Sequence, residues 1–307
     1  MIEGFQYEEI KLQDDYEGEV IATFIISENN HNNRPVVLYI HGFIDYFFHP
    51  HLSEFFHQNE YDFYALELRK YGHSILPHQH KNYCRNLEEY FEEIDFCIQK
   101  IKQQNNAPLV LMGHSTGGLI SSLYLNKGQF KDQVSALVLN SPFVETNVPS
   151  IARTVLKPMT KWISTVFPYA KLNGMLPPIY PSSLHKDFNG EWEFDLVMKP
   201  IEGFPVYFKW SSAIMDGQDY LKSHSNIHQP VVLLHSHDSY LPNKYESRVM
   251  KSDIVLNVEH MKEIGPKLGE NVTLIEIENG VHDLFLSPKK VRQQALNEMI
   301  NWLNKVI

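Results

Sequence analysis

The chain has 307 residues, of which 43% are hydrophobic and 21% are charged, so it is long enough to bury a large core. Its formal net charge of −10 argues against non-specific nucleic-acid binding and, more weakly, against binding to an anionic membrane surface. Its two cysteines, Cys84 and Cys97, are too few for a disulfide framework, and we expect both to be buried free thiols.

The beginning of the chain has neither the basic segment nor the apolar run of a signal peptide. No apolar stretch along the sequence approaches the length of a membrane span. We therefore expect a cytoplasmic protein without stable membrane insertion.

Short apolar segments recur along the chain and predict the strands of one sheet. Two segments with alternating polarity, 5–12 and 19–27, predict an opening hairpin. Continuous apolar runs are typical of strands buried on both faces of a parallel sheet, and they occupy residues 35–40, 63–68, 109–112, 136–139, 231–234 and 272–277.

Helical patterns separate these apolar runs. One stripe has apolar residues spaced by three or four, at Leu87, Phe91, Ile94, Ile98 and Ile101. Similar patterns follow Ser115 and fill residues 291–307. This alternation predicts an α/β protein with a mostly parallel central sheet of about eight strands flanked by helices.

The alternation breaks between residues 143 and 226. This segment is rich in proline and aromatic residues, has a helical pattern over 151–166 and contains no convincing buried strand. A structureless loop of this length would be unusual, so we interpret 143–226 as an inserted helical cap and 1–142 with 227–307 as the core. The alternative is a large irregular loop. The aromatic side chains could line an apolar acyl pocket or form the cap's own core.

The strongest functional signal is the G-H-S-T-G motif at residues 113–117. It follows an apolar run and precedes a helical pattern, which is the context of a nucleophile elbow centred on Ser115. The N–H group of Thr116 would then help to bind an oxyanion. The second donor is expected from the loop after residues 35–40, where Gly42 allows close approach and the N–H group of Phe43 is available. We expect His41 to support that loop and His114 to have a packing role.

A serine hydroxyl needs a base, and a histidine base needs a carboxylate. Among 16 histidines, His282 follows the last predicted strand across a short turn, at the same sheet edge as the elbow. Two acids follow the 231–234 strand. Asp238 lies closest to the strand end, whereas Asp253 lies closer to His282 in sequence and precedes a turn and a helix start. We favour Asp253 and leave Asp238 as the alternative.

These motifs resemble the α/β-hydrolase family, in its monoacylglycerol lipase, lysophospholipase and serine aminopeptidase-like branch. The resemblance rests on His41-Gly42-Phe43, the 67–74 segment, the 113–117 motif and the late acid and histidine. It implies the α/β-hydrolase fold with a helical cap, and the roles of nucleophile, base, acid and oxyanion donors fall on the residues already named. Two departures stand out, namely Lys70 in place of a glycine and an insertion at 237–252.

The sequence thus predicts a serine hydrolase that cleaves a small-molecule acyl ester through an acyl-enzyme on Ser115. No metal-ligand spacing and no phosphate-binding loop is evident, so we expect no cofactor and no metal. A serine aminopeptidase is the alternative, and it would need an acidic cap residue to bind the substrate ammonium, for which the candidates are Glu145, Asp187, Glu191 and Glu193. A non-catalytic binding protein with the same fold is a second, less favoured alternative.

Overall fold

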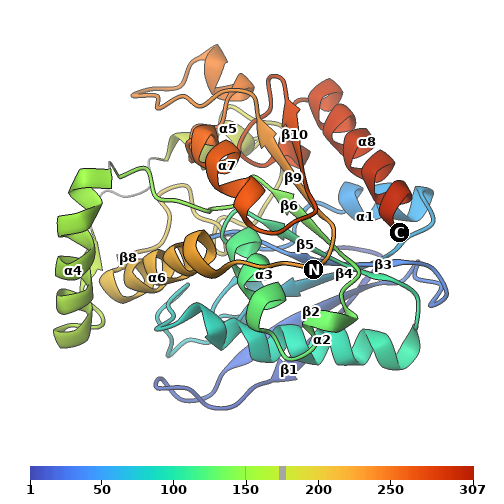
Figure 1. Ribbon diagram of the computed structural model, residues 1–307, viewed down its shortest axis with the longest axis horizontal. Coiled ribbons are helices and arrows are strands. Elements are labelled where there is room, and N and C mark those ends of the chain that lie inside the picture. The colour runs from blue at the N-terminus through green and yellow to red at the C-terminus, as the bar shows by residue number, and fades with distance from the viewer. Residues whose placement is uncertain (149, 173–177) are drawn as a thin grey trace.

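The computed structural model describes residues 1–148, 150–172 and 178–307. Its centre is an eight-stranded sheet in the order β1-β2-β4-β3-β5-β6-β9-β10 (Figure 1). The strands are β1 (Phe5–Lys11), β2 (Ile21–Ser27), β3 (Val36–Ile40), β4 (Asp62–Glu67), β5 (Leu109–His114), β6 (Ala136–Asn140), β9 (Val231–Ser236) and β10 (Val272–Ile277). β2 pairs antiparallel with β1 and β4, and the other neighbours pair parallel. This confirms the predicted hairpin and the mostly parallel sheet.

Helices cover both faces of the sheet, which explains why the central strands are apolar throughout. In β3, Val37 and Tyr39 pack into a cluster with α1 and α8, whereas Val36, Leu38 and Ile40 face a cluster with α2, α3 and α7. This alternation is the period of a strand. The helices are α1 (His51–Gln58), α2 (Phe91–Gln104), α3 (Thr116–Lys127), α7 (Val258–Ile264) and α8 (Lys289–Val306).

The described residues of segment 143–226 form three helices and a short strand pair. The helices are α4 (Ser150–Val166), α5 (Ile179–Leu184) and α6 (Phe208–His224), and β7 (Lys171–Leu172) pairs antiparallel with β8 (Val206–Tyr207). The sequence did not predict this pair. α4 packs along α6 and forms one edge of the molecule (Figure 1). α6 in turn contributes Trp210, Ile214 and Leu221 to the same hydrophobic cluster as α3, so it joins the segment to the sheet.

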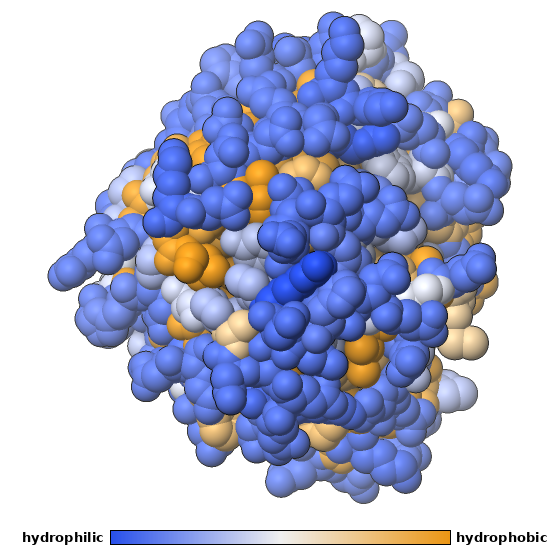
Figure 2. Space-filling model, turned by 90° about the vertical axis from the view of Figure 1, so that its right-hand side faces the viewer, coloured by the Kyte–Doolittle hydropathy of each residue, from blue (hydrophilic) through white to orange (hydrophobic). Residues whose placement is uncertain are grey.

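The surface farthest from α4 carries α8 and is mostly hydrophilic, with hydrophobic side chains in small separate groups (Figure 2). Within the described part of the chain, no helix combines the length and apolarity needed to cross a membrane. Cys84 and Cys97 are both buried and free, as predicted.

Candidate active site

Ser115 lies between β5 and α3 in a sharp turn that only its surroundings can maintain. Its backbone has φ 52° and ψ −116°, a conformation that a residue with a side chain rarely adopts. The Ser115 N–H donates to the Asn140 carbonyl at 3.0 Å. A Cβ at Gly113 would collide with the backbone of Gly117, and one at Gly117 would collide with the His41 carbonyl. The two motif glycines therefore serve close backbone approach, which holds the serine in its strained turn.

The structure brings three of the sequence-predicted side chains into a hydrogen-bonded row. His282 Nε2 lies 3.0 Å from Ser115 Oγ, and His282 Nδ1 lies 2.9 Å from Asp253 Oδ2. Because a carboxylate only accepts, the Nδ1 atom carries the proton and Nε2 is free to accept from the serine hydroxyl. All three residues are buried, with Ser115 7% exposed. In chemical terms, this row can remove a proton from Ser115 and stabilise the resulting imidazolium.

The insertion after β9 explains how Asp253 reaches His282. The chain leaves the strand end at Asp238 and returns at Asp253, where the Asp253 N–H donates to the Asp238 carbonyl at 2.9 Å. The Tyr240 N–H donates in turn to the Asp253 carbonyl at 2.9 Å. The Asp238 side chain instead faces the inserted segment, and its Oδ2 lies 2.6 Å from Arg248 Nη2. Asp238 therefore makes no contact with the histidine.

The loop after β3, residues 41–45, lies against Ser115, and we call it the oxyanion loop because the sequence analysis expects an oxyanion donor there. A Cβ placed on Gly42 would lie only 3.2 Å from Ser115 Cβ. His41 Nε2 accepts from the Leu68 N–H at 3.1 Å, so its Nδ1 carries the proton and donates to the Gly42 carbonyl at 2.8 Å. That carbonyl and the Phe43 N–H belong to one trans peptide and point in opposite directions. His41 thereby fixes the direction of the Phe43 N–H.

Thr116 supplies the other N–H group named in the sequence analysis. It is the first residue of α3, whose opening N–H groups have no acceptor within the helix. The positive end of the α3 dipole lies at the same place. An oxygen that gains negative charge beside Ser115 would meet this N–H group.

Sequence reasoning gave His114 a packing role but missed the other buried polar groups that lie behind His282. The Asp283 carboxylate accepts from Asn140 Nδ2 at 2.8 Å, and the ring of His114 lies 4.9 Å from that of His282. Burial alone would raise the pKa of Asp283, but nearby His114 and His49 lower it. Burial lowers the pKa of His49 to about 3. For Asp283, its position next to His282 was the sequence signal.

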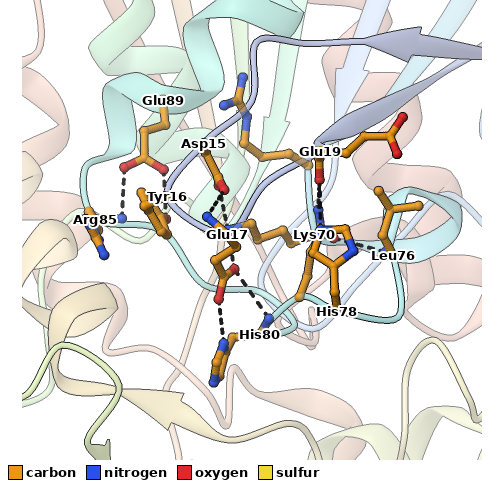
Figure 3. A network of polar contacts seen from close by, with 12 residues as sticks. Asp15, Tyr16, Glu17, Glu19, Lys70, Leu76, His78, His80, Arg85 and Glu89 are labelled. Carbon is orange, nitrogen blue, oxygen red and sulfur yellow. Dashed lines mark hydrogen bonds and ion pairs between the residues drawn. The ribbon is translucent and has the colours of Figure 1, made fainter.

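Lys70, which departs from the family pattern, forms a buried ionic cluster (Figure 3). Its φ of 66° is a left-handed conformation, which explains why the pattern has glycine there. Its ammonium lies 2.6 Å from Asp15 and 2.5 Å from Glu17, and its side chain is fully buried. Glu17 also contacts His80 Nδ1 at 2.5 Å. The lysine thus ties the β1–β2 connection to the loop after β4.

The four acids of segment 143–226 considered for an ammonium site are either paired or exposed. Glu145 pairs with Arg153 and Lys222, Glu191 with Arg292, and Glu193 with Lys186. The Asp187 side chain is 67% exposed. Among the aromatic candidates for an acyl pocket, Trp162 and Phe167 are more than half exposed, whereas Trp210 is buried against the oxyanion loop.

Comparison with solved structures identifies the fold. A soluble variant of monoglyceride lipase from Saccharomyces cerevisiae, in complex with a substrate analog, superposes with a TM-score of 0.70 at 18% identity, over 99% of this chain and 95% of that chain. Monoacylglycerol lipase from Paleococcus ferrophilus superposes with a TM-score of 0.65 at 18% identity, over 98% of this chain and 100% of that chain. These similarities establish the α/β-hydrolase fold.

Comparison of sequences identifies the family. A Schizosaccharomyces pombe protein named "Putative monoglyceride lipase" is 24% identical over 140 residues, which are 44% of this chain and 37% of that protein. The chain thus matches well under half the length of this relative. The family model described as serine aminopeptidase, S33 (Hydrolase_4) matches residues 31–289, which is most of the chain. The protein therefore belongs to the S33 serine aminopeptidase (Hydrolase_4) family of α/β-hydrolases.

Proposed function

We propose that this protein is a serine hydrolase that cleaves carboxylic esters through an acyl-enzyme on Ser115. The observation that carries the proposal is the row Ser115–His282–Asp253, with heavy-atom distances of 3.0 and 2.9 Å. We further propose that the backbone N–H groups of Phe43 and Thr116, which flank Ser115 in the fold, donate to the oxyanion. The combination of an activated hydroxyl and two oxyanion donors suits acyl transfer.

In the proposed reaction, His282 takes the proton of Ser115 while the hydroxyl oxygen attacks the acyl carbonyl. The carbonyl oxygen becomes an oxyanion, to which the N–H groups of Phe43 and Thr116 donate. His282 then gives its proton to the leaving alcohol, which departs and leaves the acyl group on Ser115. A water molecule that loses its proton to His282 attacks the acyl-enzyme, and the carboxylic acid is released. Asp253 accepts from Nδ1 throughout.

The family description favours a second candidate, a serine aminopeptidase. Such an enzyme must hold the ammonium of its substrate near the nucleophile with a free carboxylate. Within the described residues, Glu145, Glu191 and Glu193 already pair with cations, and Asp187 is exposed to solvent. Asp45, the acid of the oxyanion loop itself, likewise already pairs with Lys199. These charges favour a neutral ester over an amino-terminal peptide.

We also propose that residues 143–226 act as a cap over the candidate active site. The segment leaves the sheet after β6, whose last residue, Asn140, accepts from the Ser115 N–H, so its first residues lie beside the elbow. Its Tyr180 hydroxyl accepts from the Asp283 N–H at 2.9 Å, and the Tyr180 ring lies 5.5 Å from that of His282. Contacts of this kind would allow the segment to shield the acyl-enzyme from bulk water.

The proposal is tested with p-nitrophenyl esters from acetate to palmitate, assayed beside aminoacyl arylamides. We expect ester turnover, and we expect Ser115→Ala to lower kcat by about 10⁶. A fluorophosphonate probe should label the wild type and leave Ser115→Ala unlabelled. Turnover of arylamides alone would favour the aminopeptidase. No Ser115-dependent turnover and no labelling would contradict the proposed function and favour a binding protein.

A further inference from the structure

The oxyanion loop contains a strained residue that its own sequence does not stabilise. Ile44 has φ 51°, in the left-handed region that a β-branched side chain strongly disfavours. Such a conformation persists only where surrounding contacts force it. Ile44 immediately follows Phe43, whose N–H is the proposed oxyanion donor. The contacts that impose the strain at Ile44 therefore also set the position of the Phe43 N–H.

Those contacts come from the segment 143–226. Phe43 stacks on Trp210, with ring centroids 4.0 Å apart. A Cβ on Gly203 would lie 3.2 Å from Ile44 Cδ1, so the two residues touch. The carboxylate of Asp45 lies 2.6 Å from Lys199 Nζ. Three consecutive residues of the oxyanion loop are thus each held by a residue of this segment.

The ion pair is the most directional of the three contacts. The side chains of Lys199 and Asp45 are only 8% and 4% exposed. The ammonium also lies 4.7 Å from the ring centroid of Phe48 and 5.3 Å from that of Phe194, so aromatic faces surround it. Burial alone would raise the pKa of Asp45, but the pairing with Lys199 and the adjacent histidines lower it to about 2. The Asp45 carboxylate is therefore charged at neutral pH, and the contact with Lys199 is shielded from water.

Backbone hydrogen bonds hold the lysine in place within its own segment. The Lys199 N–H donates to the Asp195 carbonyl at 2.9 Å, and the Asp195 N–H donates to the Tyr46 hydroxyl at 2.7 Å. Tyr46 directly follows Asp45 in the chain. The segment and the loop are thus joined at two adjacent points, which leaves Lys199 little freedom to move away from Asp45.

We propose that Lys199 is a positioning residue, whose ion pair with Asp45 holds the oxyanion loop in the strained form that directs the Phe43 N–H at the substrate carbonyl. This inference rests on the proposed function and adds a role for segment 143–226 beyond covering the site. Lys199 acts through the loop and touches no reacting atom. Its loss should therefore weaken the transition state, in which the oxyanion forms, more than the binding of the substrate.

The test uses the full chain and four variants. Lys199→Met removes the charge, and Lys199→Arg keeps it. The double variant Lys199→Met with Asp45→Asn removes the pair without leaving a buried charge, so it should fold even where the single variant does not. Lys186→Met is the matched control, because Lys186 pairs with Glu193 in the same segment but is 46% exposed. Thermal unfolding followed by circular dichroism checks the fold of each variant.

We expect Lys199→Met and the double variant to lower kcat on p-nitrophenyl acetate and octanoate by roughly 10- to 100-fold. KM should stay within about twofold, and the affinity for a trifluoromethyl ketone, whose adduct with Ser115 is an oxyanion, should fall by the same factor as kcat. Lys199→Arg should recover most of the lost kcat. Lys186→Met should match the wild type.

Three results would overturn the inference. One is an unchanged kcat in the folded double variant, which would leave Lys199 only the structural role of balancing Asp45. Another is an unchanged kcat with a raised KM for the octanoate, which would make Lys199 part of an acyl pocket. A wild type without Ser115-dependent turnover would remove the proposed function and this inference with it, whereas an active wild type with active variants would remove this inference alone.

Discussion

Replacing Asp253 by asparagine probes the candidate triad sharply, because the contacts around this carboxylate leave an amide no good orientation. Asp253 Oδ1 accepts from the N–H groups of Val255 and Leu256, each at 2.8 Å, and Oδ2 lies 2.9 Å from His282 Nδ1. With the amide oxygen kept toward the two N–H groups, the NH₂ group faces Nδ1 and drives the histidine proton to Nε2. The reverse orientation sets the NH₂ group against two backbone donors.

An imidazole protonated at Nε2 cannot accept a proton from Ser115. The wrong tautomer costs about 10⁴ in kcat in comparable triads, which corresponds to about 5.4 kcal/mol of activation free energy. Asp238→Asn is the matched control. The Asp238 side chain is 40% exposed and pairs with Arg248, so its loss should cost less than about 1 kcal/mol of stability and leave kcat unchanged.

The assay is the kcat of the wild type and both asparagine variants on one p-nitrophenyl ester, with circular dichroism to confirm folding. A folded Asp253→Asn variant with kcat within about tenfold of the wild type would refute the tautomer reasoning. A larger loss in Asp238→Asn than in Asp253→Asn would reverse the choice of acid.

Three further predictions follow from buried groups. His41→Ala frees the Gly42 carbonyl and should lower kcat roughly tenfold with little change in KM, measured on p-nitrophenyl acetate; an unchanged kcat would contradict the role given to His41. Lys70→Met leaves Asp15 and Glu17 buried without their cation and should lower the free energy of unfolding in urea by about 3–5 kcal/mol. The control Lys100→Met removes a partly exposed pair with Glu8 and should cost less than about 1 kcal/mol, and equal effects of the two variants would refute the reasoning. The pKa of His49 falls from 6.5 to about 3 on folding, so the unfolded chain binds the proton first and stability is lost as pH falls through this range. Between pH 7 and 5, His49→Leu should therefore lose about 2 kcal/mol less unfolding free energy than the wild type, measured in urea, and an equal loss would contradict the burial argument.

Much of the fold could be predicted because the central strands are buried on both faces. In a chain of this polarity, a continuous apolar run such as 109–112 is typical of a strand buried on both faces, and β5 spans these residues. Helix α6 was not predicted, because it packs between α3 and α4 and buries residues around most of its circumference, which leaves no clear apolar stripe. β7 and β8 have two residues each, too few for any period to appear.

The sequence by itself determined which side chains could meet. The ends of parallel strands share one edge of a sheet, so the order of the motifs brings Phe43, Ser115 and His282 toward one another without further information. The position of Glu67–Ser74 within the family pattern likewise marked Lys70 as unusual. These are properties of local sequence and of topology, and both can be read along the chain.

Only the tertiary structure decided which acid faces His282 and what holds the oxyanion loop. Sequence spacing favoured Asp253 but left Asp238 open. Asp253 reaches the histidine because the inserted segment after Asp238 closes through backbone hydrogen bonds, which spacing alone does not show. Lys199 and Asp45 are 154 residues apart, and their pairing depends on how segment 143–226 folds back over the sheet. A local pattern cannot record a contact between residues so distant, because it arises from packing.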